Sequence, residues 1–363
     1  MSQVVIVGGG VVGAMVAYEL SRLGQTVTLC ESDVPGAGST GAALGVLMGI
    51  ISQKTTGRGW RLREQSIRRY QTLLPELTTL TGQGIPHNSH GIVMLRFADD
   101  PHDHRWQRLQ KVREKQGWPL ELWDREELRS HCPQLESDRL LGAVYSPQDG
   151  QLDPLALTAA LWAGAQHYGA DCRSSTPVEG LGCDQQRCTE VVANGKTLAC
   201  DWLILAAGLG STPLTAQLQQ PVAIQPVLGQ AFRVKLPQPL DFQDFAPVIS
   251  GEDVHLVPLG GGEYWIGATV EFPDDQGVVV ADPGLKEQVW QQAIALCPAL
   301  APGKIVETWS GLRPRPQGQP APLIGPLPGY RNVLLATGHY RNGVLLAPAT
   351  AEAISEAICG IMT

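Results

Sequence analysis

The strongest constraint on the fold lies in the first 31 residues. Residues 3–8 form an almost unbroken apolar run that ends in glycine, the pattern of a parallel strand buried on both faces. A glycine-rich turn follows at 8–13, and then an apolar helix is predicted over 14–23 and a second strand over 26–31. This order of elements within about thirty residues is typical of a βαβ unit that opens a Rossmann-like α/β domain.

The turn has the spacing Gly8-x-Gly10-x-x-Gly13, and Glu31 stands at the end of the second strand. Gly8 permits a tight turn, Gly10 lets the backbone approach a pyrophosphate, and Gly13 allows the helix to pack closely on the strand. The start of the helix, which includes Val12, offers free N–H groups and the positive end of the helix dipole. Glu31 can accept hydrogen bonds from a ribose. Together these features predict a bound dinucleotide.

A second glycine-rich segment at 36–45 favours FAD over NAD as this dinucleotide. A plain nicotinamide domain needs no such loop after the ribose-binding strand, whereas a flavin extends along it. Hydroxyl groups in the loop can donate to phosphate, and its small residues leave room for the isoalloxazine edge. We assign to the cofactor Ser39, Thr40, Ala42, Ala43 and Gly45. A flexible surface loop without a ligand is the alternative for this segment taken alone.

The rest of the chain predicts two interleaved domains. Buried strands are expected at 202–207 and 332–337, each running into a glycine, so the first sheet is revisited at 175–210 and 332–337. Residues 86–97 and 222–273 read instead as antiparallel strands. The expected FAD-binding domain therefore comprises 1–81, 151–219 and 326–363, and the expected substrate domain comprises 82–150 and 220–325.

Local signals place several turns and helix ends. Asp153 and Pro154 mark the start of a helix that ends before Gly169. Asn194-Gly195 between two apolar runs is typical of a type I′ hairpin. A final helix is predicted from about Gly343 to about Ile361.

Composition excludes several classes of protein. The net charge is −8, which argues against a nucleic-acid partner. No apolar run approaches the roughly 20 residues that a bilayer requires, and the N-terminus has no secretory signal, so a cytoplasmic location is expected. The eight cysteines are scattered without a CxxC pair, and the histidines lack clean metal spacing, so no metal site is predicted. The sequence leaves open whether the chain forms a homo-oligomer.

Six blocks of sequence together resemble the flavin-dependent glycine oxidase and D-amino acid oxidase/dehydrogenase family. The matching blocks are 5–13, 39–43, 203–208, Ser310-Gly-Leu-Arg-Pro314, Pro322-Leu-Ile-Gly325 and Gly338-His-Tyr-Arg-Asn-Gly-Val-Leu-Leu-Ala-Pro348. The resemblance spans both expected domains. It implies an embedded, non-covalent FAD and an inserted antiparallel β-rich substrate domain. It also implies oxidation of an amino acid or amine by hydride transfer to flavin N5, giving an imine and then a 2-oxo acid, with oxygen or another acceptor taking the electrons.

The same resemblance assigns roles to individual residues. Arg313 matches the arginine that binds the substrate carboxylate, a task that suits its planar fork. Arg341 matches a second active-site arginine, and Val178 matches a backbone contact to the adenine. The residues that the resemblance places at the cofactor near the ends of later strands are Ala207, Gly208, Gly338, Tyr340, Arg341, Asn342, Gly343, Val344 and Leu345.

One position departs from the glycine oxidase pattern. Where those enzymes carry a tyrosine before x-Val-Pro, this chain has His255 in Val254-His-Leu-Val-Pro258. His255 could donate the same hydrogen bond to a carboxylate, could favour a bulkier substrate, or could be an ordinary strand histidine.

Two other functions stay open as alternatives. One is a flavoprotein hydroxylase, and the other is a non-catalytic assembly subunit that keeps the flavin fold.

Overall fold

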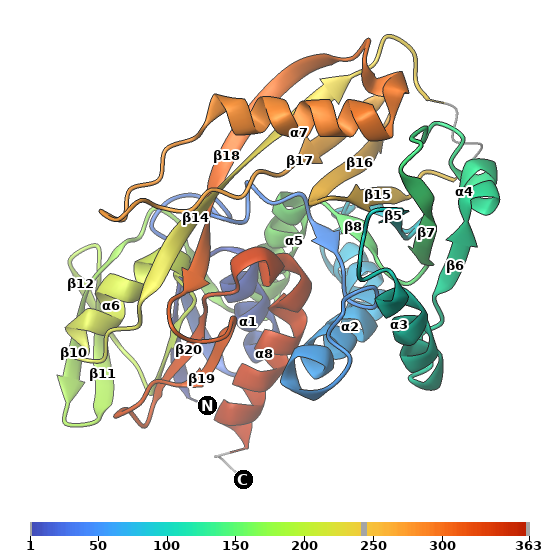
Figure 1. The fold of residues 1–363 in the computed structure, drawn as a ribbon. Helices are drawn as coiled ribbons and strands as arrows, with labels where there is room; N and C mark the ends of the chain where they lie inside the picture. The colour runs from blue at the N-terminus through green and yellow to red at the C-terminus, as the bar shows by residue number, and fades with distance from the viewer. Residues whose placement is uncertain (1, 241–244, 361–363) are drawn as a thin grey trace.

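The fold is described from a computed structural model, which covers residues 2–240 and 245–360. Its strands form four sheets, the largest of six and eight strands. In Figure 1 the eight-stranded sheet lies above, with helix α7 (Pro283–Leu296) along it, and helices α1 (Val11–Arg22) and α8 (Gly343–Cys359) lie below. The long strands β14 (Ile224–Lys235) and β18 (Lys304–Pro316) run down from the upper sheet toward these helices.

The six-stranded sheet confirms the predicted Rossmann-like domain. Its strand order is β19-β20-β13-β1-β2-β9, and every pair is parallel except β19 with β20. The strands are β1 (Gln3–Val7), β2 (Thr26–Cys30), β9 (Asp171–Arg173), β13 (Trp202–Leu205), β19 (Leu323–Pro326) and β20 (Val333–Thr337). Both faces of β1 are buried, since Val4 and Ile6 join one hydrophobic cluster and Val5 and Val7 join another. Burial on both faces therefore explains the apolar run at residues 3–8, as predicted.

Helices cover one face of this sheet, and a small sheet covers the other. Helix α1 packs on α8 and on α5 (Pro154–His167). On the opposite face lies a separate antiparallel sheet of β10 (Val178–Asp184), β11 (Arg187–Ala193) and β12 (Lys196–Ala199). The prediction that 175–210 returns to the first sheet is thus wrong for 178–199, because these strands pair with one another.

The predicted local signals are mostly confirmed. The side chain of Asp153 caps α5 by accepting from the Leu155 and Ala156 amides, with Pro154 as the first helical residue. Asn194 and Gly195 have φ of 48° and 66°, the left-handed backbone of a type I′ turn. Helix α1 begins three residues earlier than predicted. Ile361, the predicted end of the last helix, lies outside the described residues.

The eight-stranded sheet has the order β18-β14-β17-β16-β15-β5-β7-β6. Its further strands are β5 (Ile92–Phe97), β6 (Glu121–Asp124), β7 (Leu140–Ser146), β15 (Val248–Gly251), β16 (Val254–Gly260) and β17 (Glu263–Gly267). The antiparallel prediction needs one correction, because β15 pairs with β5 in parallel. These two strands come from the separate ranges 82–150 and 220–325, so the sheet joins them without a hairpin.

The remaining elements lie around these two sheets. A short sheet contains β3 (Val46–Leu47), β8 (Gly150–Leu152) and β4 (His87–Asn88). The other helices are α2 (Gly57–Thr81), α3 (His104–Lys115), α4 (Arg125–His131) and α6 (Ser211–Gln217), with short 3-10 turns η1 (Gly208–Gly210), η2 (Pro298–Leu300) and η3 (Tyr340–Asn342). No helix within 2–240 or 245–360 is long and apolar enough to cross a membrane.

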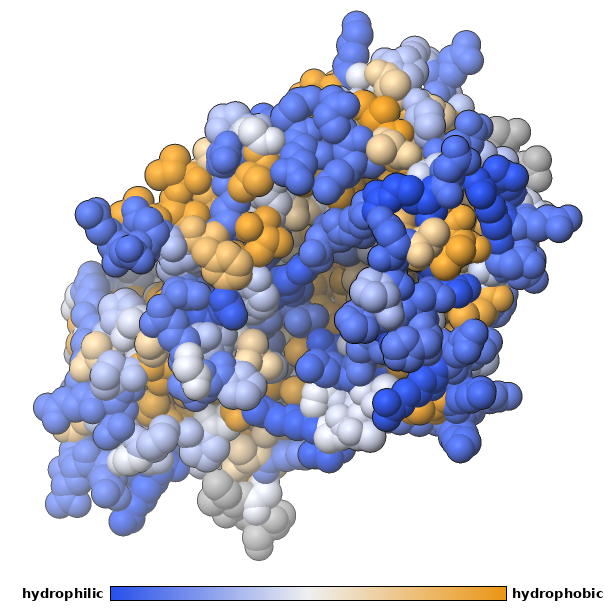
Figure 2. Space-filling model, viewed as in Figure 1, coloured by the Kyte–Doolittle hydropathy of each residue, from blue (hydrophilic) through white to orange (hydrophobic). Residues whose placement is uncertain are grey.

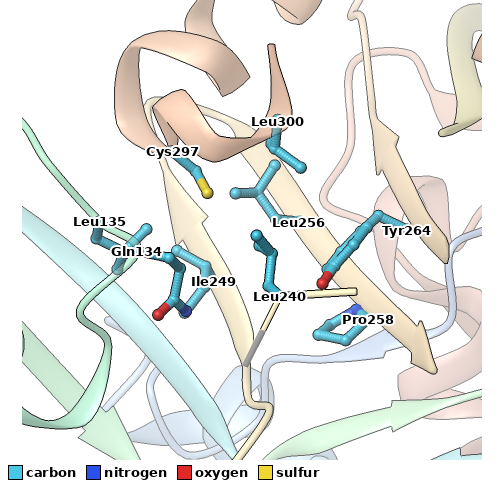
Figure 3. A pocket seen from close by; sticks show the side chains of 9 residues that line it. All are labelled: Gln134, Leu135, Leu240, Ile249, Leu256, Pro258, Tyr264, Cys297 and Leu300. Carbon is cyan, nitrogen blue, oxygen red and sulfur yellow. The ribbon is translucent and has the colours of Figure 1, made fainter. Parts of the chain in front are cut away.

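The two faces of the eight-stranded sheet differ. On one face Phe232, Leu256 and Ile266 pack under α7. Figure 3 shows a small cavity on this side, lined mainly by apolar residues from the sheet, from the segment that follows α7 and from the neighbouring loops. His255 adjoins Leu256, and consecutive strand residues point to opposite faces, so His255 lies on the other face, toward the FAD-binding domain. The cavity is thus separate from the face that carries the predicted site residues.

Candidate active site

The glycine turn has the close contacts that its spacing predicts. Gly8 has φ of +106°, and a Cβ there would lie 2.6 Å from the Ala206 carbonyl oxygen. A Cβ on Gly13 would lie 1.9 Å from the Gly8 carbonyl oxygen, so only glycine lets α1 approach β1 this closely. The predicted structural roles of Gly8 and Gly13 are confirmed.

Groups suited to a dinucleotide surround this turn. The amide N–H groups of Gly10 and Val12 make no hydrogen bond to any residue in the described ranges. They stand at the positive end of the α1 dipole, where an anion is stabilised. The Glu31 carboxylate accepts from the Gly9 amide at 2.6 Å, from the Asp33 amide and from the Ser32 hydroxyl. A fixed carboxylate beside free amides is a donor and acceptor set that fits the pyrophosphate and ribose of FAD.

The loop at 36–45 contacts both the start of helix α1 and strand β18. The Thr40 hydroxyl accepts from the Val11 amide at 3.1 Å and so satisfies one amide at the start of α1. The Ser39 hydroxyl donates to the Leu312 carbonyl oxygen at 2.6 Å rather than standing free, and its assignment to phosphate stays a prediction. A Cβ on Gly311 would lie 2.2 Å from the Cβ of Ala42, so the backbone of β18 packs directly against this loop.

The other small residues of that loop have packing reasons for their identity. Gly45 has φ of +70°, and a Cβ there would lie 1.8 Å from the Leu152 carbonyl oxygen. Ala43 donates its amide to the Thr40 carbonyl oxygen at 3.1 Å. The contact of either residue with a cofactor stays a prediction.

Three predicted segments meet at one edge of the parallel sheet. Gly8, Gly208 and Gly338 follow β1, β13 and β20, which are neighbours in the sheet. The carboxyl ends of parallel strands form the ligand-binding edge of such sheets. The Thr337 hydroxyl donates to the Gly208 carbonyl oxygen at 3.2 Å and ties two of these ends together, next to Ala207.

The segment before Val178 approaches the same edge from the ribose side. The Thr176 amide donates to the Glu31 carbonyl oxygen at 2.6 Å, two residues before Val178 enters β10. Val178 therefore lies close to the predicted ribose-binding residue, and its contact with the adenine stays a prediction.

The turn after Gly338 leads into the N-terminus of α8. Tyr340 has φ of +54° and begins η3, and Gly343 is the first residue of α8. Arg63 donates to the Asn342 side-chain oxygen at 3.5 Å, so the long helix α2 contacts this turn. The free N–H groups expected at Val344 and Leu345 stand at the positive end of the α8 dipole, as the predicted flavin contact requires.

Arg313 is a largely buried cation whose bonds go only to neutral groups. Its Nη1 donates to the carbonyl oxygens of Leu228 and Thr269 at 3.1 and 3.0 Å. Within the described residues it makes no ion pair, and its Nε and Nη2 make no hydrogen bond. Burial lowers the pKa of Arg313, with nearby Arg341 as a further cause. An arginine in this position is suited to bind a carboxylate from outside the protein.

Sequence reasoning missed the groups that hold this arginine. A Cβ on Gly229 would lie 2.2 Å from Arg313 Nη2, so the guanidinium rests in the space that a side chain would fill. Buried Glu271 accepts from the Thr269 hydroxyl, from Gln230 Nε2 at 3.0 Å and from the Asp282 amide at 2.7 Å. This network fixes the segment that supplies the Thr269 carbonyl. No sequence motif marks it, because its members come together only in the folded sheet.

His255 lies near Arg313 and Arg341, the two arginines predicted at the active site. It pairs with Gly267 of β17 and Ser250 of β15, and its Nδ1 is 2.9 Å from the Ser250 hydroxyl. Burial, with the nearby charges of Arg341 and Arg313 as further causes, lowers its pKa to about 4. Its Nε2 has no hydrogen-bond partner among the described residues, so a neutral imidazole can offer an N–H to a substrate.

Arg341 has a different environment from Arg313. It is partly exposed, and both its terminal nitrogens lie 3.1 Å from one carboxylate oxygen of exposed Asp253. Its charge is therefore already compensated within the protein. The predicted role of Arg341 at the substrate stays a prediction.

Comparison with known proteins agrees with this arrangement. The sequence profile of the FAD dependent oxidoreductase (DAO) family matches residues 3–357. The chain belongs to this family. It is 29% identical to the glycine oxidase of Bacillus licheniformis and 30% identical to that of Geobacillus kaustophilus, in both cases over 98% of this chain and 92% of the relative. The crystal structure of glycine oxidase from Geobacillus kaustophilus superposes with a TM-score of 0.87 at 28% identity, covering 99% of this chain and 95% of that one.

Membership of the family establishes the general chemistry. The protein is an FAD-dependent oxidoreductase of the amino acid oxidase and dehydrogenase type. A bifunctional ThiO/ThiG protein of Trichormus variabilis is also similar, at 31% identity, but this chain spans only 52% of it. The predicted fold, cofactor and class of enzyme are confirmed, and the roles of individual residues at the cofactor and substrate stay predictions.

Proposed function

We propose that the protein catalyses the oxidative deamination of a small amino acid or secondary amine that carries a carboxylate. The observation that supports this most directly is Arg313, a buried guanidinium that rests on neutral carbonyls and leaves Nε and Nη2 free among the described residues. A substrate carboxylate would supply the missing negative charge in a bidentate pair. The similarity to glycine oxidases supports the same class of substrate.

The bound flavin would accept a hydride at N5 from the carbon that bears the amine. Water would then hydrolyse the imine to a 2-oxo acid, releasing ammonia from a primary amine or the N-substituted amine from a secondary amine. The protein would contribute alignment and electrostatics. Arg313 would hold the carboxylate, and His255 Nε2 would donate to it in place of the tyrosine of glycine oxidases. The Ser250 hydroxyl lies 2.9 Å from Nδ1, and in the tautomer where Ser250 donates to Nδ1 the neutral imidazole would carry its proton on Nε2.

Two tryptophans would exclude water from one side of the site. The indole N–H of Trp309 donates to the Ala42 carbonyl oxygen at 3.2 Å, and its ring meets that of Trp265 edge-on with centroids 6.0 Å apart. Both residues are on the sheet face toward the flavin loop. No side-chain base is needed if the substrate amine enters neutral.

The test is an anaerobic visible spectrum of the purified FAD-bound protein during addition of amino acids. The panel comprises glycine, sarcosine, D-alanine, D-proline and L-proline. We expect one or more to bleach the flavin bands, and admitting air would then distinguish an oxidase from a dehydrogenase. A bound flavin that no amine reduces, but that NADPH with an aromatic acid reduces, would instead indicate a hydroxylase. A flavin that nothing reduces would indicate an assembly subunit. The predicted cytoplasmic location is a separate proposal.

A further inference from the structure

A second arginine lies beside Arg313 on the same face of β18. Residues two apart in a strand point to the same side, so Trp309, Gly311, Arg313 and Arg315 share one face. Gly311 on this face contacts Ala42 of the predicted flavin loop. The Cα atoms of Arg313 and Arg315 are separated by one two-residue strand repeat, about 7 Å.

Both guanidinium groups cross β14 in the same direction. Arg313 pairs with Val227 in the strand register, but its guanidinium reaches Gly229 and the carbonyl of Thr269. Thr269 belongs to the strap, residues 268–272, which continues along β14 through mutual hydrogen bonds of Leu228 and Glu271. Arg315 reaches the same strap, because its guanidinium carbon lies 5.0 Å from the Phe272 ring centroid.

Arg315 has aromatic neighbours but no acidic one. Its guanidinium carbon also lies 5.6 Å from the ring centroid of Tyr340, in the turn before α8. Within the described residues it forms no ion pair and no side-chain hydrogen bond. Arg341, in the same region, differs because Asp253 pairs with it. Two neighbouring guanidinium groups thus present unpaired donors to the space between the strap and the turn.

We propose that Arg315 binds a second carboxylate of the substrate, so that the enzyme prefers an amino acid or amine with two carboxylates. This inference rests on the proposed function, since it takes Arg313 as the binding group of the first carboxylate. Stacking between two rings fixes the direction of the Arg315 side chain at little further entropic cost. Both guanidinium groups reach the same five-residue strap, at Thr269 and at Phe272, so they lie close enough for us to propose one small dicarboxylate as their common ligand.

The first experiment compares substrates that differ by one charge. Anaerobic flavin reduction of the holoenzyme is measured with D-aspartate against D-asparagine, and with N-carboxymethylglycine against N-methylglycine. We expect the dicarboxylate of at least one pair to be favoured by roughly ten-fold or more in reduction rate divided by half-saturation concentration. Equal or lower efficiency for both dicarboxylates would contradict the inference.

The second experiment removes the charge with Arg315→Gln. We expect the preference for the dicarboxylate to fall to about one, while the monocarboxylate partner stays within about three-fold of the unmodified enzyme. Arg108→Gln, at an exposed position on α3, controls for loss of one positive charge and should keep the preference. If Arg315→Gln weakens both members of a pair equally, Arg315 is only a structural residue stacked on Phe272 and Tyr340.

A binding measurement separates this inference from the proposed function. Glutarate and butyrate are titrated into the oxidised holoprotein, and the shift of the flavin spectrum gives each dissociation constant. Tighter binding of glutarate that Arg315→Gln abolishes supports the second carboxylate position even if no amine on the panel reduces the flavin. Glutarate binding that does not depend on Arg315 overturns it, whatever the reaction is.

Discussion

Arg113 is fully buried and Arg313 largely buried, neither has a carboxylate in contact, and the two differ in how many of their donors the protein uses. Arg113 donates to the carbonyl oxygens of Ile50, Ser52 and Lys54 and to the Gln116 side chain, at 2.6 to 2.8 Å. Arg313 uses only Nη1 for bonds within the protein. The fold thus satisfies the donors of Arg113, whereas Arg313 keeps Nε and Nη2 without partners among the described residues, where we propose that a ligand binds.

The surroundings of Arg113 show what a structural arginine requires. Its guanidinium carbon lies 3.6 Å from the Trp60 ring centroid, and its exposed fraction is zero. Burial lowers its pKa to about 10, so it stays charged at neutral pH. Across the same segment, the Asp149 carboxylate accepts from the amides of Gly49, Ile50 and Ile51 and from the Ser146 hydroxyl. The chain at 49–54 is therefore held by Arg113 through its carbonyls and by Asp149 through its amides.

The largest effect is expected for Arg113→Met. The change leaves the carbonyl oxygens of Ile50, Ser52 and Lys54 without their shared donor at a site where Arg113 itself is fully buried, which should cost about 3–5 kcal/mol of unfolding free energy. Thermal and denaturant unfolding of the holoprotein measure this, with Arg108→Met as the exposed control on the same helix. Unchanged stability would mean that the distinction between the two arginines is not one of hydrogen-bond saturation.

Arg313→Met should show the opposite pattern. We expect a loss of about 2–5 kcal/mol in transition-state binding, seen as a fall in the efficiency of flavin reduction by the best amine, because the carboxylate loses its charged partner. The unfolding free energy should fall by less than in Arg113→Met, because fewer carbonyls lose a donor: the Leu228 carbonyl still accepts from the Glu271 amide, and the Thr269 carbonyl loses the Arg313 bond. A variant as active as the parent would remove Arg313 from the substrate site.

Gly229→Ala tests whether the position of Arg313 matters as well as its charge. The added Cβ would lie 2.2 Å from Nη2 and must displace the guanidinium. We expect about 1–3 kcal/mol of weaker substrate binding, with the half-saturation concentration changing more than the limiting rate. Gly84→Ala is the matched control, because a Cβ there meets nothing within 4 Å. Equal effects of the two substitutions would mean that the space beside Gly229 does not position the Arg313 guanidinium.

The smallest expected effect concerns a buried histidine, His339, whose contribution to stability should depend on pH. His339 has one side-chain partner, the Thr350 hydroxyl at 2.9 Å, and burial lowers its pKa from 6.5 to about 3. Between these pH values the unfolded chain binds a proton that the folded chain does not, so stability should fall as the pH drops below about 6.5. His339→Asn should flatten that slope between pH 6.5 and 4. An unaltered slope would mean that other groups cause it.

The sequence predicts the parts of the molecule whose cause is local. The βαβ unit, the cap at Asp153 and the hairpin at Asn194 follow from residues close together in the chain, and each is present in the fold. Arg313 was found only because its block resembles a known family. No local pattern encodes contacts between β14, the strap and β18. Such contacts produce the space beside Gly229 that Arg313 fills, the hydrogen bonds of Glu271 and the stacking of Arg315. The parallel pairing of β5 with β15 escaped prediction for the same reason.

The most direct test of the account is whether the free donors of Arg313 bind a carboxylate. Acetate, which has no amine to oxidise, is titrated into the oxidised holoprotein and into Arg313→Met and Arg108→Met, and the flavin spectrum is followed in each. We predict a saturable spectral shift in the parent and in Arg108→Met, and none in Arg313→Met with its flavin still bound. A shift of equal affinity in Arg313→Met would contradict the central claim, because the carboxylate would then bind elsewhere.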